Sequence, residues 1–257
     1  MIGRNDLAWD ESDRSFALGG LRFVTVHGGG GFDDWTPGEN CLLFYKTRAL
    51  VEQYLDWFAT LADPPHGGNL VELGLYDGGS VPFWFEILQP DRHVGLDIRA
   101  PRTPKYLDRY LEHEQRRERV GLHWGTDQTD ARRLQELCDG AFGDEPIDLV
   151  IDDASHLYEH TRRSFEILFP RLRPGRGLYI IEDWAWNHWR GIEGEWRGRR
   201  PLGDLVTQLV EVAGSTSNHV VTGIHVCSGF AAIRRGWAPA ESLSDFSVER
   251  FIYRHPR

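Results

Sequence analysis

One stretch, residues 148–184, constrains the fold of this chain more than any other. It contains two short apolar runs, Leu149–Ile151 and Leu178–Ile181, each bounded by polar residues, which is typical of buried parallel strands. Between the two runs, apolar residues fall near helical spacing, and Pro174–Gly175 then ends the helix. The stretch therefore predicts a strand–helix–strand unit with two parallel strands.

Acidic residues end both predicted strands. Asp152 and Asp153 follow the first strand, and Glu182 and Asp183 follow the second, while His156 stands at the start of the helix. Neighbouring strands lie about 4.8 Å apart, so the carboxylates should meet at the sheet edge where open α/β sheets bind ligands. Crowded carboxylates favour a hard cation such as Mg²⁺, which predicts a metal site beside a histidine base. The alternative is that each residue only caps a helix or ends a strand.

Composition limits the class of protein. The 257 residues, 40% of them hydrophobic, are enough for one large domain or two small ones. The sequence has no run of about 18 apolar residues, and its first residues are too acidic and polar for a signal peptide. Its three cysteines do not have the number or spacing of a disulfide framework. Together these features predict a cytoplasmic protein without a membrane partner. The net charge of −10 disfavours a nucleic-acid polymer as partner but allows a small anionic substrate.

Residues 1–62 are expected to form an N-terminal cap and residues 63–257 the main domain, because the first segment has too few apolar residues for its own core. In the cap, we expect an extended arm at residues 1–20 and a strand at residues 21–26. A glycine-rich loop at residues 27–40 and an amphipathic helix at residues 43–61 should follow. The loop could cover an active site or simply lie on the surface, and both interpretations stay open.

Strands and helices alternate from Asn69 onward. Strands are predicted at residues 70–73, 93–96, 119–124, 149–151, 178–181, 219–227 and 230–234. Helices are predicted at residues 79–88, 103–118, 130–138 and 201–212, besides the one in the opening unit. The last two strands meet across Ser228–Gly229, close enough for a hairpin. The sequence therefore predicts an α/β fold whose seven-stranded sheet is mainly parallel and ends in an antiparallel pair.

A glycine-rich turn, VELGLYDGGS at residues 71–80, follows the first parallel strand and opens a helix. It is neither GxGxxG nor a P-loop, and its acidic Glu72 suits a cationic amine better than a pyrophosphate. Asp97 ends the next strand, where a carboxylate can accept both hydroxyls of a ribose, and Asp127 and Asp130 follow the third. Together these features predict an adenosyl ligand, although Asp97 alone fits a turn and Asp130 a helix N-cap.

The segments VELGLYDGGS, GLDI, IDDASH and IIEDW together resemble the class I S-adenosylmethionine-dependent methyltransferases, which have a Rossmann-like fold. More narrowly, they resemble the metal-dependent sugar O-methyltransferases of antibiotic biosynthesis, such as those acting on macrolide deoxysugars in tylosin and mycinamicin synthesis. The length and layout also resemble enzymes that methylate TDP-rhamnose in calicheamicin biosynthesis. The resemblance covers roughly residues 42–235, and IDDxSH followed by a strand ending in ED is its most specific part.

The resemblance implies roles for individual residues. It implies Asp153, Glu182 and Asp183 as Mg²⁺ ligands, with His156 as the general base and Asp153 beside it in the catalytic set. The residues predicted to contact S-adenosylmethionine are Glu72, Gly74, Tyr76, Ser80, Asp97, Asp127 and Asp152. The segment after the second strand departs from the Asp-Ser-Phe often found in the family, so ribose contacts beyond Asp97 are left open.

An aromatic and basic segment, Trp184–Arg200, follows the predicted metal strand and holds four of the ten tryptophans and four arginines. Trp184, Trp186 and Arg190 are predicted to contact the substrate, since tryptophan can stack on a sugar or base and arginine can bind a phosphate. A nucleotide-linked sugar would suit this segment. The alternative is a subunit interface.

The principal functional hypothesis is an S-adenosylmethionine- and Mg²⁺-dependent O-methyltransferase that acts on a deoxysugar hydroxyl. The deoxysugar would belong either to a TDP-sugar such as TDP-rhamnose or to a glycosylated natural product. A catechol-type O-methyltransferase could use the same carboxylates. An oxygenase lacks support because no 2-His-1-carboxylate triad is evident. A non-catalytic methyltransferase-fold binding protein would have no need of the acidic residues and the histidine. A homo-oligomer is expected from the family.

Overall fold

The computed structural model describes residues 3–25, 41–100, 105–190, 194, 197–215, 219–239, 243 and 245–253 of the chain. The predicted glycine-rich loop at residues 27–40 lies outside the described residues, as does part of Trp184–Arg200. Among the helices that are described, none combines the length and the apolar character that crossing a membrane requires. The predictions of a cytoplasmic location and of a homo-oligomer stay predictions.

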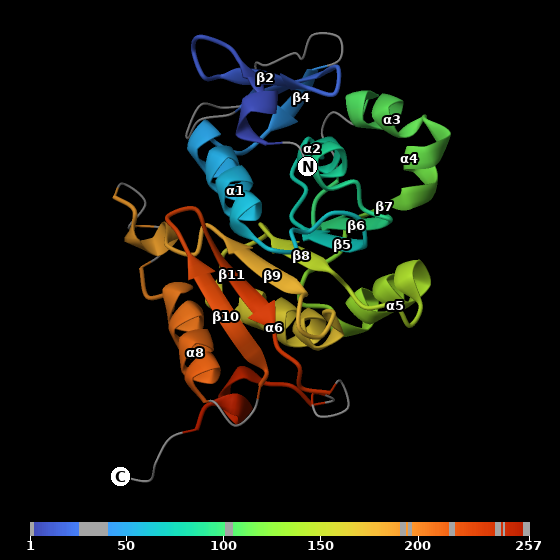
Figure 1. The fold of residues 1–257 in the computed structure, drawn as a ribbon. Coiled ribbons are helices and arrows are strands. Elements are labelled where there is room, and N and C mark those ends of the chain that lie inside the picture. The colour runs from blue at the N-terminus through green and yellow to red at the C-terminus, as the bar shows by residue number, and fades with distance from the viewer. Residues whose placement is uncertain are drawn as a thin grey trace.

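A seven-stranded sheet forms the centre of the molecule (Figure 1). Its strands in chain order are β5 (Asn69–Leu73), β6 (Arg92–Asp97), β7 (Val120–Trp124), β8 (Leu149–Asp152), β9 (Leu178–Glu182), β10 (Val221–Val226) and β11 (Phe230–Arg235). Their spatial order is β10-β11-β9-β8-β5-β6-β7, and only β11 runs antiparallel to its neighbours. The predicted parallel sheet with an antiparallel C-terminal pair is therefore confirmed.

The chain changes direction across the sheet between β5 and β8. From β5 it runs outward through β6 and β7, and it then returns to place β8 on the other side of β5. The loops that leave β5 and β8 therefore turn away from each other. Such a switch point opens a crevice beyond the carboxyl ends of the two strands, where open α/β sheets bind ligands.

Helices cover both faces of this sheet (Figure 1). On one face lie α1 (Arg48–Thr60) and α2 (Ser80–Leu88), and on the other lie α5 (Ala131–Phe142), α6 (Tyr158–Leu168) and α8 (Gly203–Gly214). Near β7 the chain forms α3 (Lys105–Leu111) and α4 (Glu114–Arg119), and single 3-10 turns occur at Arg4–Asp6, Phe169–Arg171, Trp186–His188 and Val248–Phe251. The single helix predicted for residues 103–118 is wrong, because the backbone is extended at His113.

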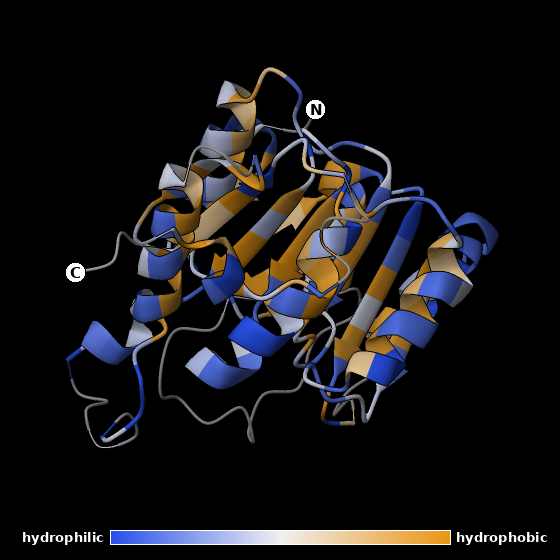
Figure 2. Ribbon diagram, turned by 90° about the horizontal axis from the view of Figure 1, so that it is seen from below, coloured by the Kyte–Doolittle hydropathy of each residue, from blue (hydrophilic) through white to orange (hydrophobic). Residues whose placement is uncertain are grey.

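Strand residues alternate between the two apolar layers that this arrangement creates. In β8, Leu149 and Ile151 pack in the layer with α1 and α2, whereas Val150 packs in the layer with α5, α6 and α8. The central strands β5, β8 and β9 are consequently buried on both faces, and Figure 2 shows a hydrophobic centre between helices whose outer sides are hydrophilic. This double burial explains why β8 and β9 appear in the sequence as unbroken apolar runs.

The N-terminal cap is more regular than predicted. Its strands β1 (Ala8–Trp9), β2 (Ser15–Leu18), β3 (Leu21–Thr25) and β4 (Cys41–Phe44) form a second sheet in that order. The predicted arm at residues 1–20 is therefore wrong, since Phe16 is buried against Phe23 with ring centres 4.8 Å apart. The helix also begins later than predicted, at Arg48, because the Thr47 hydroxyl accepts from the Leu50 amide as an N-cap. The domain boundary at residue 62 stays a prediction.

Gly74 permits a close approach between the turns that follow β5 and β8. Its φ is +88°, and a Cβ at this position would lie 2.1 Å from the Asp153 carbonyl oxygen. Gly74→Ala is therefore expected to destabilise the protein by about 3 kcal/mol, because it adds backbone strain and a clash that only a shift of the Asp153 loop relieves. Urea unfolding measures the change through the midpoint.

The matched control for this substitution is Gly140→Ala in α5, where a Cβ would meet no described atom within 4 Å. Alanine has a higher helix propensity than glycine, so this variant should be more stable than the wild type by up to about 1 kcal/mol. Equal midpoints for the two variants would contradict the proposed close packing at Gly74.

Candidate active site

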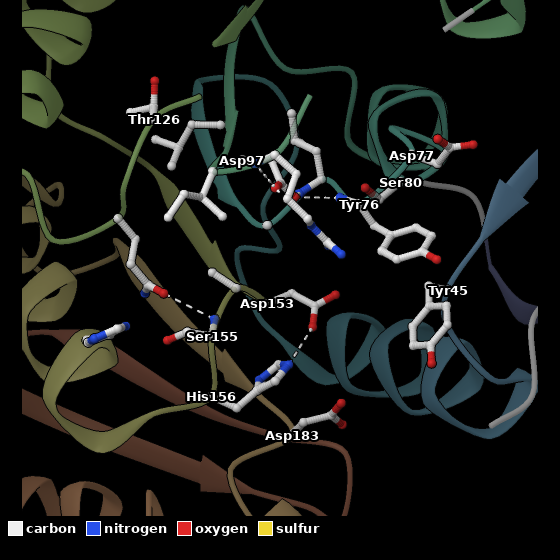
Figure 3. A pocket seen from close by; sticks show the side chains of 18 of the residues that line it. Tyr45, Tyr76, Asp77, Ser80, Asp97, Thr126, Asp153, Ser155, His156 and Asp183 are labelled. Atoms are coloured by element: carbon white, nitrogen blue, oxygen red, sulfur yellow. Dashed lines mark hydrogen bonds and ion pairs between the residues drawn. The ribbon is translucent and has the colours of Figure 1, made fainter. Parts of the chain in front are cut away.

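A cavity of about 420 Å³ opens at the carboxyl ends of the parallel strands, at the switch point between β5 and β8 (Figure 3). The loops after β5, β6, β7, β8 and β9 all contribute to its wall, and the N-terminal cap contributes Tyr45 and Lys46. The predicted site residues that line it are Gly74, Tyr76, Ser80, Asp97, Asp127, Asp153, His156, Asp183 and Trp186. Segments more than 100 residues apart in sequence thus meet in one crevice.

Asp97 organises the end of the cavity that lies between β5 and β6. Its Oδ2 accepts from the backbone amides of Leu75 at 3.0 Å and Tyr76 at 2.8 Å, and its Oδ1 accepts from the Arg99 amide at 2.8 Å. These bonds hold the glycine-rich turn against the end of β6 (Figure 3). A carboxylate in this position retains acceptor sites for hydroxyl groups, which fits the predicted ribose contact.

Three stacked side chains lie at the mouth of this part of the cavity. The Arg99 guanidinium lies 4.8 Å from the centre of the Tyr76 ring, and the Tyr76 ring stacks on Tyr45 with centres 5.2 Å apart. Tyr45 comes from the segment between β4 and α1, so the stack joins the cap to the central sheet. Tyr45 and Arg99 were not predicted as site residues, since their partners are distant in sequence.

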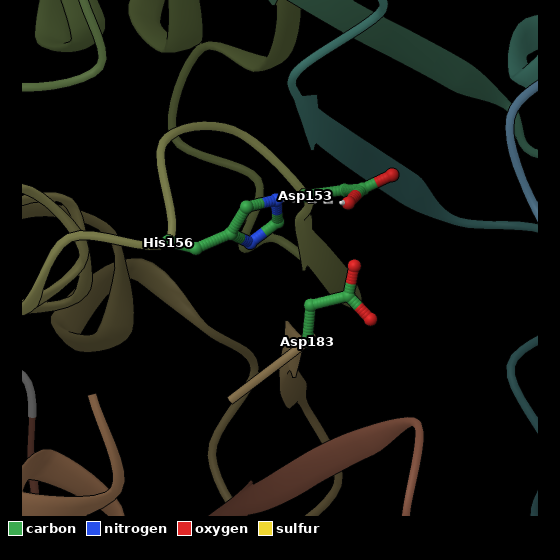
Figure 4. A group of neighbouring side chains, drawn as sticks. All are labelled: Asp153, His156 and Asp183. Carbon is green, nitrogen blue, oxygen red and sulfur yellow. Dashed lines mark ion pairs between the residues drawn. The ribbon is translucent and has the colours of Figure 1, made fainter. Parts of the chain in front are cut away.

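Asp153, His156 and Asp183 point toward one another at the opposite end of the cavity (Figure 4). Each offers an atom that could bind a metal, and these atoms lie within 4.8 Å of one another. His156 Nε2 is 3.7 Å from Asp153 Oδ1. His156 and Asp183 have φ values of 54° and 51°, which is strained backbone for residues other than glycine. Such strain is concentrated at functional sites, where the surrounding fold maintains it.

Lys46 enters the same cluster from the cap, and no pattern in the sequence around it indicates this position. Its Nζ donates to Asp153 Oδ2 at 2.6 Å and to Glu182 Oε2 at 2.7 Å, and the lysine side chain is only 2% exposed. The Tyr54 hydroxyl of α1 donates to the other Glu182 oxygen at 2.8 Å. Both oxygens of Glu182 are thus hydrogen-bonded inside the protein, and its predicted role as a metal ligand stays a prediction.

The carboxylates of this cluster carry more negative charge than one lysine neutralises. Burial, followed by the charge of Asp153, raises the pKa of Glu182 to about 8 and that of Asp183 to about 6, although Lys46 opposes both shifts. No hydrogen bond reaches the Asp183 carboxylate from the described residues. The donor set and the excess of negative charge therefore fit a hard divalent cation on the cavity side of Asp153 and Asp183.

Two further predicted cofactor residues lie behind the cavity wall. Asp152 is buried and accepts hydrogen bonds from the hydroxyls of Tyr179 at 2.7 Å and Ser164 at 2.8 Å, and burial raises its pKa. Glu72 is buried 3.1 Å from His93 Nε2. Neither carboxylate lines the cavity, so their predicted contacts with S-adenosylmethionine stay predictions.

The Asp152 network also reaches the loop that carries His156. Gln128 donates to Ser164 at 3.1 Å, and its side-chain oxygen accepts from the Ser155 amide at 3.1 Å. A buried side chain from the loop after β7 thus fixes the backbone one residue before His156. Gln128 follows the predicted Asp127 directly, but no sequence pattern separated their roles.

The three predicted substrate residues have different surroundings. Trp186 lines the cavity, with its ring centre 4.6 Å from that of His156 in an edge-on arrangement. Trp184 packs against the core and donates through Nε1 to the Cys227 carbonyl at 2.9 Å. Arg190 is exposed and does not line the cavity. Of these three residues, only Trp186 lines the cavity in the described part of the chain, and the substrate roles of all three stay predictions.

The strand order, the glycine-rich turn and the acidic strand ends define a class I methyltransferase fold, as predicted. Residues 71–184 match the family model described as a methyltransferase domain. The chain is 36% identical over 177 residues to demethylmacrocin O-methyltransferase of Streptomyces fradiae, covering 63% of this chain and 40% of the relative.

Other similar proteins are also named as O-methyltransferases. The chain is 37% identical over 133 residues to 8-demethyl-8-alpha-L-rhamnosyl tetracenomycin-C 2'-O-methyltransferase of Streptomyces olivaceus, covering 49% of this chain and 31% of the relative. A solved structure of the mycinamicin-pathway methyltransferase MycE, in complex with Mg, SAH and mycinamycin VI, is 27% identical with a TM-score of 0.50, covering 74% of this chain and 49% of that one. The resemblance to sugar O-methyltransferases of antibiotic biosynthesis is confirmed, and the chain spans less than half the length of these relatives.

Proposed function

We propose that this chain is an S-adenosylmethionine- and Mg²⁺-dependent O-methyltransferase that acts on a sugar hydroxyl in antibiotic biosynthesis. The observation that carries the proposal is the convergence of Asp153, His156 and Asp183 on one cavity whose other end is formed by the glycine-rich turn and Asp97. A methyl acceptor and a methyl donor can therefore bind at adjoining positions. The names of the relatives, which are sugar O-methyltransferases, support the reaction class.

In this proposal, the bound cofactors supply an electrophilic methyl group and a Lewis acid that lowers the pKa of the sugar hydroxyl. Asp153 and Asp183 would hold the metal ion, and Asp97 and the turn after β5 would orient the methyl donor. His156 takes the hydroxyl proton on its imidazole, and Asp153, 3.7 Å from Nε2, stabilises the imidazolium that forms. Because both substrates are held in one crevice, the reaction becomes effectively intramolecular.

The position of Trp186 favours a ring-shaped methyl acceptor beside the proposed base, His156. Its indole stands next to His156 at the cavity wall, where an apolar ring face could pack on it. We favour a nucleotide-linked deoxysugar such as TDP-rhamnose, with a glycosylated natural product as the other form of the same acceptor. Exposed Arg190 and Arg197, which follow Trp186 in the sequence, could bind the phosphates of a TDP-sugar.

A binding and turnover experiment tests this function. S-adenosylhomocysteine and MgCl₂ should each raise the melting temperature of the full chain, because a ligand that binds only the folded state stabilises it. With S-adenosylmethionine and Mg²⁺ present, TDP-rhamnose should gain one methyl group by mass spectrometry, and chelation with EDTA should abolish the product. The same assay is run with a catechol and with a glycosylated natural product. Methylation of the catechol, but of neither the TDP-sugar nor the glycoside, would refute the proposed substrate class.

A further inference from the structure

A lysine is buried where the proposed metal site needs negative charge. Lys46 lies in the turn between β4 and α1, and its ammonium contacts one oxygen of Asp153 and one of Glu182. The residues on either side of Lys46 are fixed as well, since Phe44 of β4 packs on Phe83 with ring centres 4.7 Å apart and Thr47 caps α1. The folded cap therefore places the ammonium at the carboxylates, where the lysine side chain is buried.

Two cations would have to share Asp153 if a metal ion binds there. A hard divalent ion binds a carboxylate oxygen at about 2.1 Å, and the Lys46 Nζ is 2.6 Å from Asp153 Oδ2. A metal on the other oxygen of Asp153 would be only a few ångströms from the ammonium, at a distance where like charges in a protein repel strongly. A metal that approached Glu182 would have to displace the ammonium from it.

We propose that Lys46 is a built-in competitor of the metal ion: it holds Asp153 and Glu182 together before a divalent cation binds, and it lowers the affinity of the site for that cation. The inference rests on the metal dependence in the proposed function. It explains how three carboxylates, of which Glu182 is fully buried, can lie together, because Glu182 and Asp153 have a cation in contact without any metal. Its consequence is a site that is preformed but binds divalent ions weakly.

A purely structural role for Lys46 gives a different expectation. If the lysine only anchored the cap to the sheet, its removal would loosen the carboxylates, and metal binding would weaken or stay the same. If it competes, its removal exposes one more carboxylate and removes a repelling charge, and metal binding becomes tighter. The two roles therefore predict opposite changes in the same dissociation constant.

Lys46→Met removes the charge and keeps the length of the side chain. Isothermal titration of the full chain with MgCl₂, and separately with MnCl₂, should give a dissociation constant lower than that of the wild type by roughly tenfold or more. In EDTA the variant should melt at a lower temperature than the wild type, because Glu182 loses a buried partner, and Mg²⁺ should raise its melting temperature by more than it raises that of the wild type.

Arg48→Met is the matched control. Arg48 is two residues away and pairs with Glu52 at 2.7 Å and with Asp13, and it does not line the cavity. Its replacement should leave the metal dissociation constant within about twofold of the wild type. Lys46→Gln, which is neutral but can still donate hydrogen bonds, should also bind metal more tightly and serves if the methionine variant does not fold.

Unchanged or weaker metal binding in a folded Lys46 variant, alongside normal binding by the wild type, would overturn the inference. Absence of metal binding by both the wild type and the Lys46 variants would instead refute the metal dependence in the proposed function. If both neutral variants bind the metal more tightly than the wild type and Arg48→Met binds it as the wild type does, the competition is established.

Discussion

His156→Ala is expected to lower kcat for methyl transfer by roughly 10³-fold, while Mg²⁺ and S-adenosylhomocysteine bind within about twofold of their wild-type affinities. The proposed reaction needs a group that removes the hydroxyl proton as the methyl group is transferred, and His156 stands at the cavity wall beside Asp153. Its removal takes away that acceptor but leaves Asp183, Asp97 and the glycine-rich turn in place. Single-turnover rates with mass detection, together with calorimetry for the two ligands, measure both parts of the expectation.

The control for this variant is His160→Ala, which removes the other histidine among the described cavity residues. His160 lies in α6 and is not a member of the Asp153–His156–Asp183 cluster, so its loss should reduce kcat by less than about tenfold. Added imidazole should partly restore the His156 variant and have no effect on the control. If His156→Ala kept more than about a third of wild-type turnover, another group would have to be the base.

The centre of the seven-stranded sheet was predictable because β5, β8 and β9 are buried on both faces. Runs such as Leu149–Ile151 have no polar side to obscure them, and the acidic residues and glycines that follow mark where each strand ends. The break between α3 and α4 was not predictable, because residues 111–114 contain neither glycine nor proline and remain compatible with a helix.

The N-terminal cap was misassigned because its strands are short and depend on distant partners. Phe16 and Phe23 contact each other and also Phe83 of α2, and this aromatic packing lies across the boundary between the cap and the main domain. A four-residue strand such as Ser15–Leu18 has too few positions to show a period on its own. Lys46 was missed for a related reason: it stands 107 residues before Asp153, and nothing near it in the sequence indicates that partner.

The acidic strand ends show how far a sequence pattern can resolve a site. Asp152 and Asp153 are consecutive, yet Asp152 points into the layer of α6 and bonds Ser164, whereas Asp153 lines the cavity. Glu182 and Asp183 divide in the same way, with Glu182 directed at Tyr54 of α1. Successive side chains at the end of a strand point in different directions, so the sequence located the edge of the sheet but could not assign each carboxylate to one side.

Asp183→Asn is expected to weaken Mg²⁺ binding by about 100-fold and to abolish most turnover at neutral pH, because the amide is neutral and a poor ligand for a hard cation. Asp183 is the clearest ligand candidate, since it lines the cavity and accepts no hydrogen bond from the described residues. Calorimetry with MgCl₂ gives the affinity. Asp204→Asn, which removes an exposed carboxylate paired with Arg200 at 3.0 Å, should bind Mg²⁺ like the wild type.

The raised pKa of Asp183, about 6 against a usual 3.8, fixes the pH dependence of the same experiment. The folded protein binds a proton at Asp183 more tightly than the unfolded chain does, so ionised Asp183 destabilises the metal-free protein above about pH 6, and this destabilisation disappears as the pH falls toward 4. Metal binding needs the ionised form, and Mg²⁺ affinity should therefore fall as the pH drops through about 6.

Asp183→Asn separates stability from metal binding. The variant should unfold less readily than the wild type in EDTA at neutral pH, by about 2 kcal/mol, because it removes a carboxylate that burial and Asp153 keep unfavourable. It should also lose the Asp183 contribution to the pH dependence of unfolding between about pH 4 and pH 6. A variant that was less stable than the wild type and yet bound Mg²⁺ normally would show that Asp183 supports the fold and is no ligand. Greater stability together with lost affinity is the combination that a metal ligand held in a repulsive, preformed site requires.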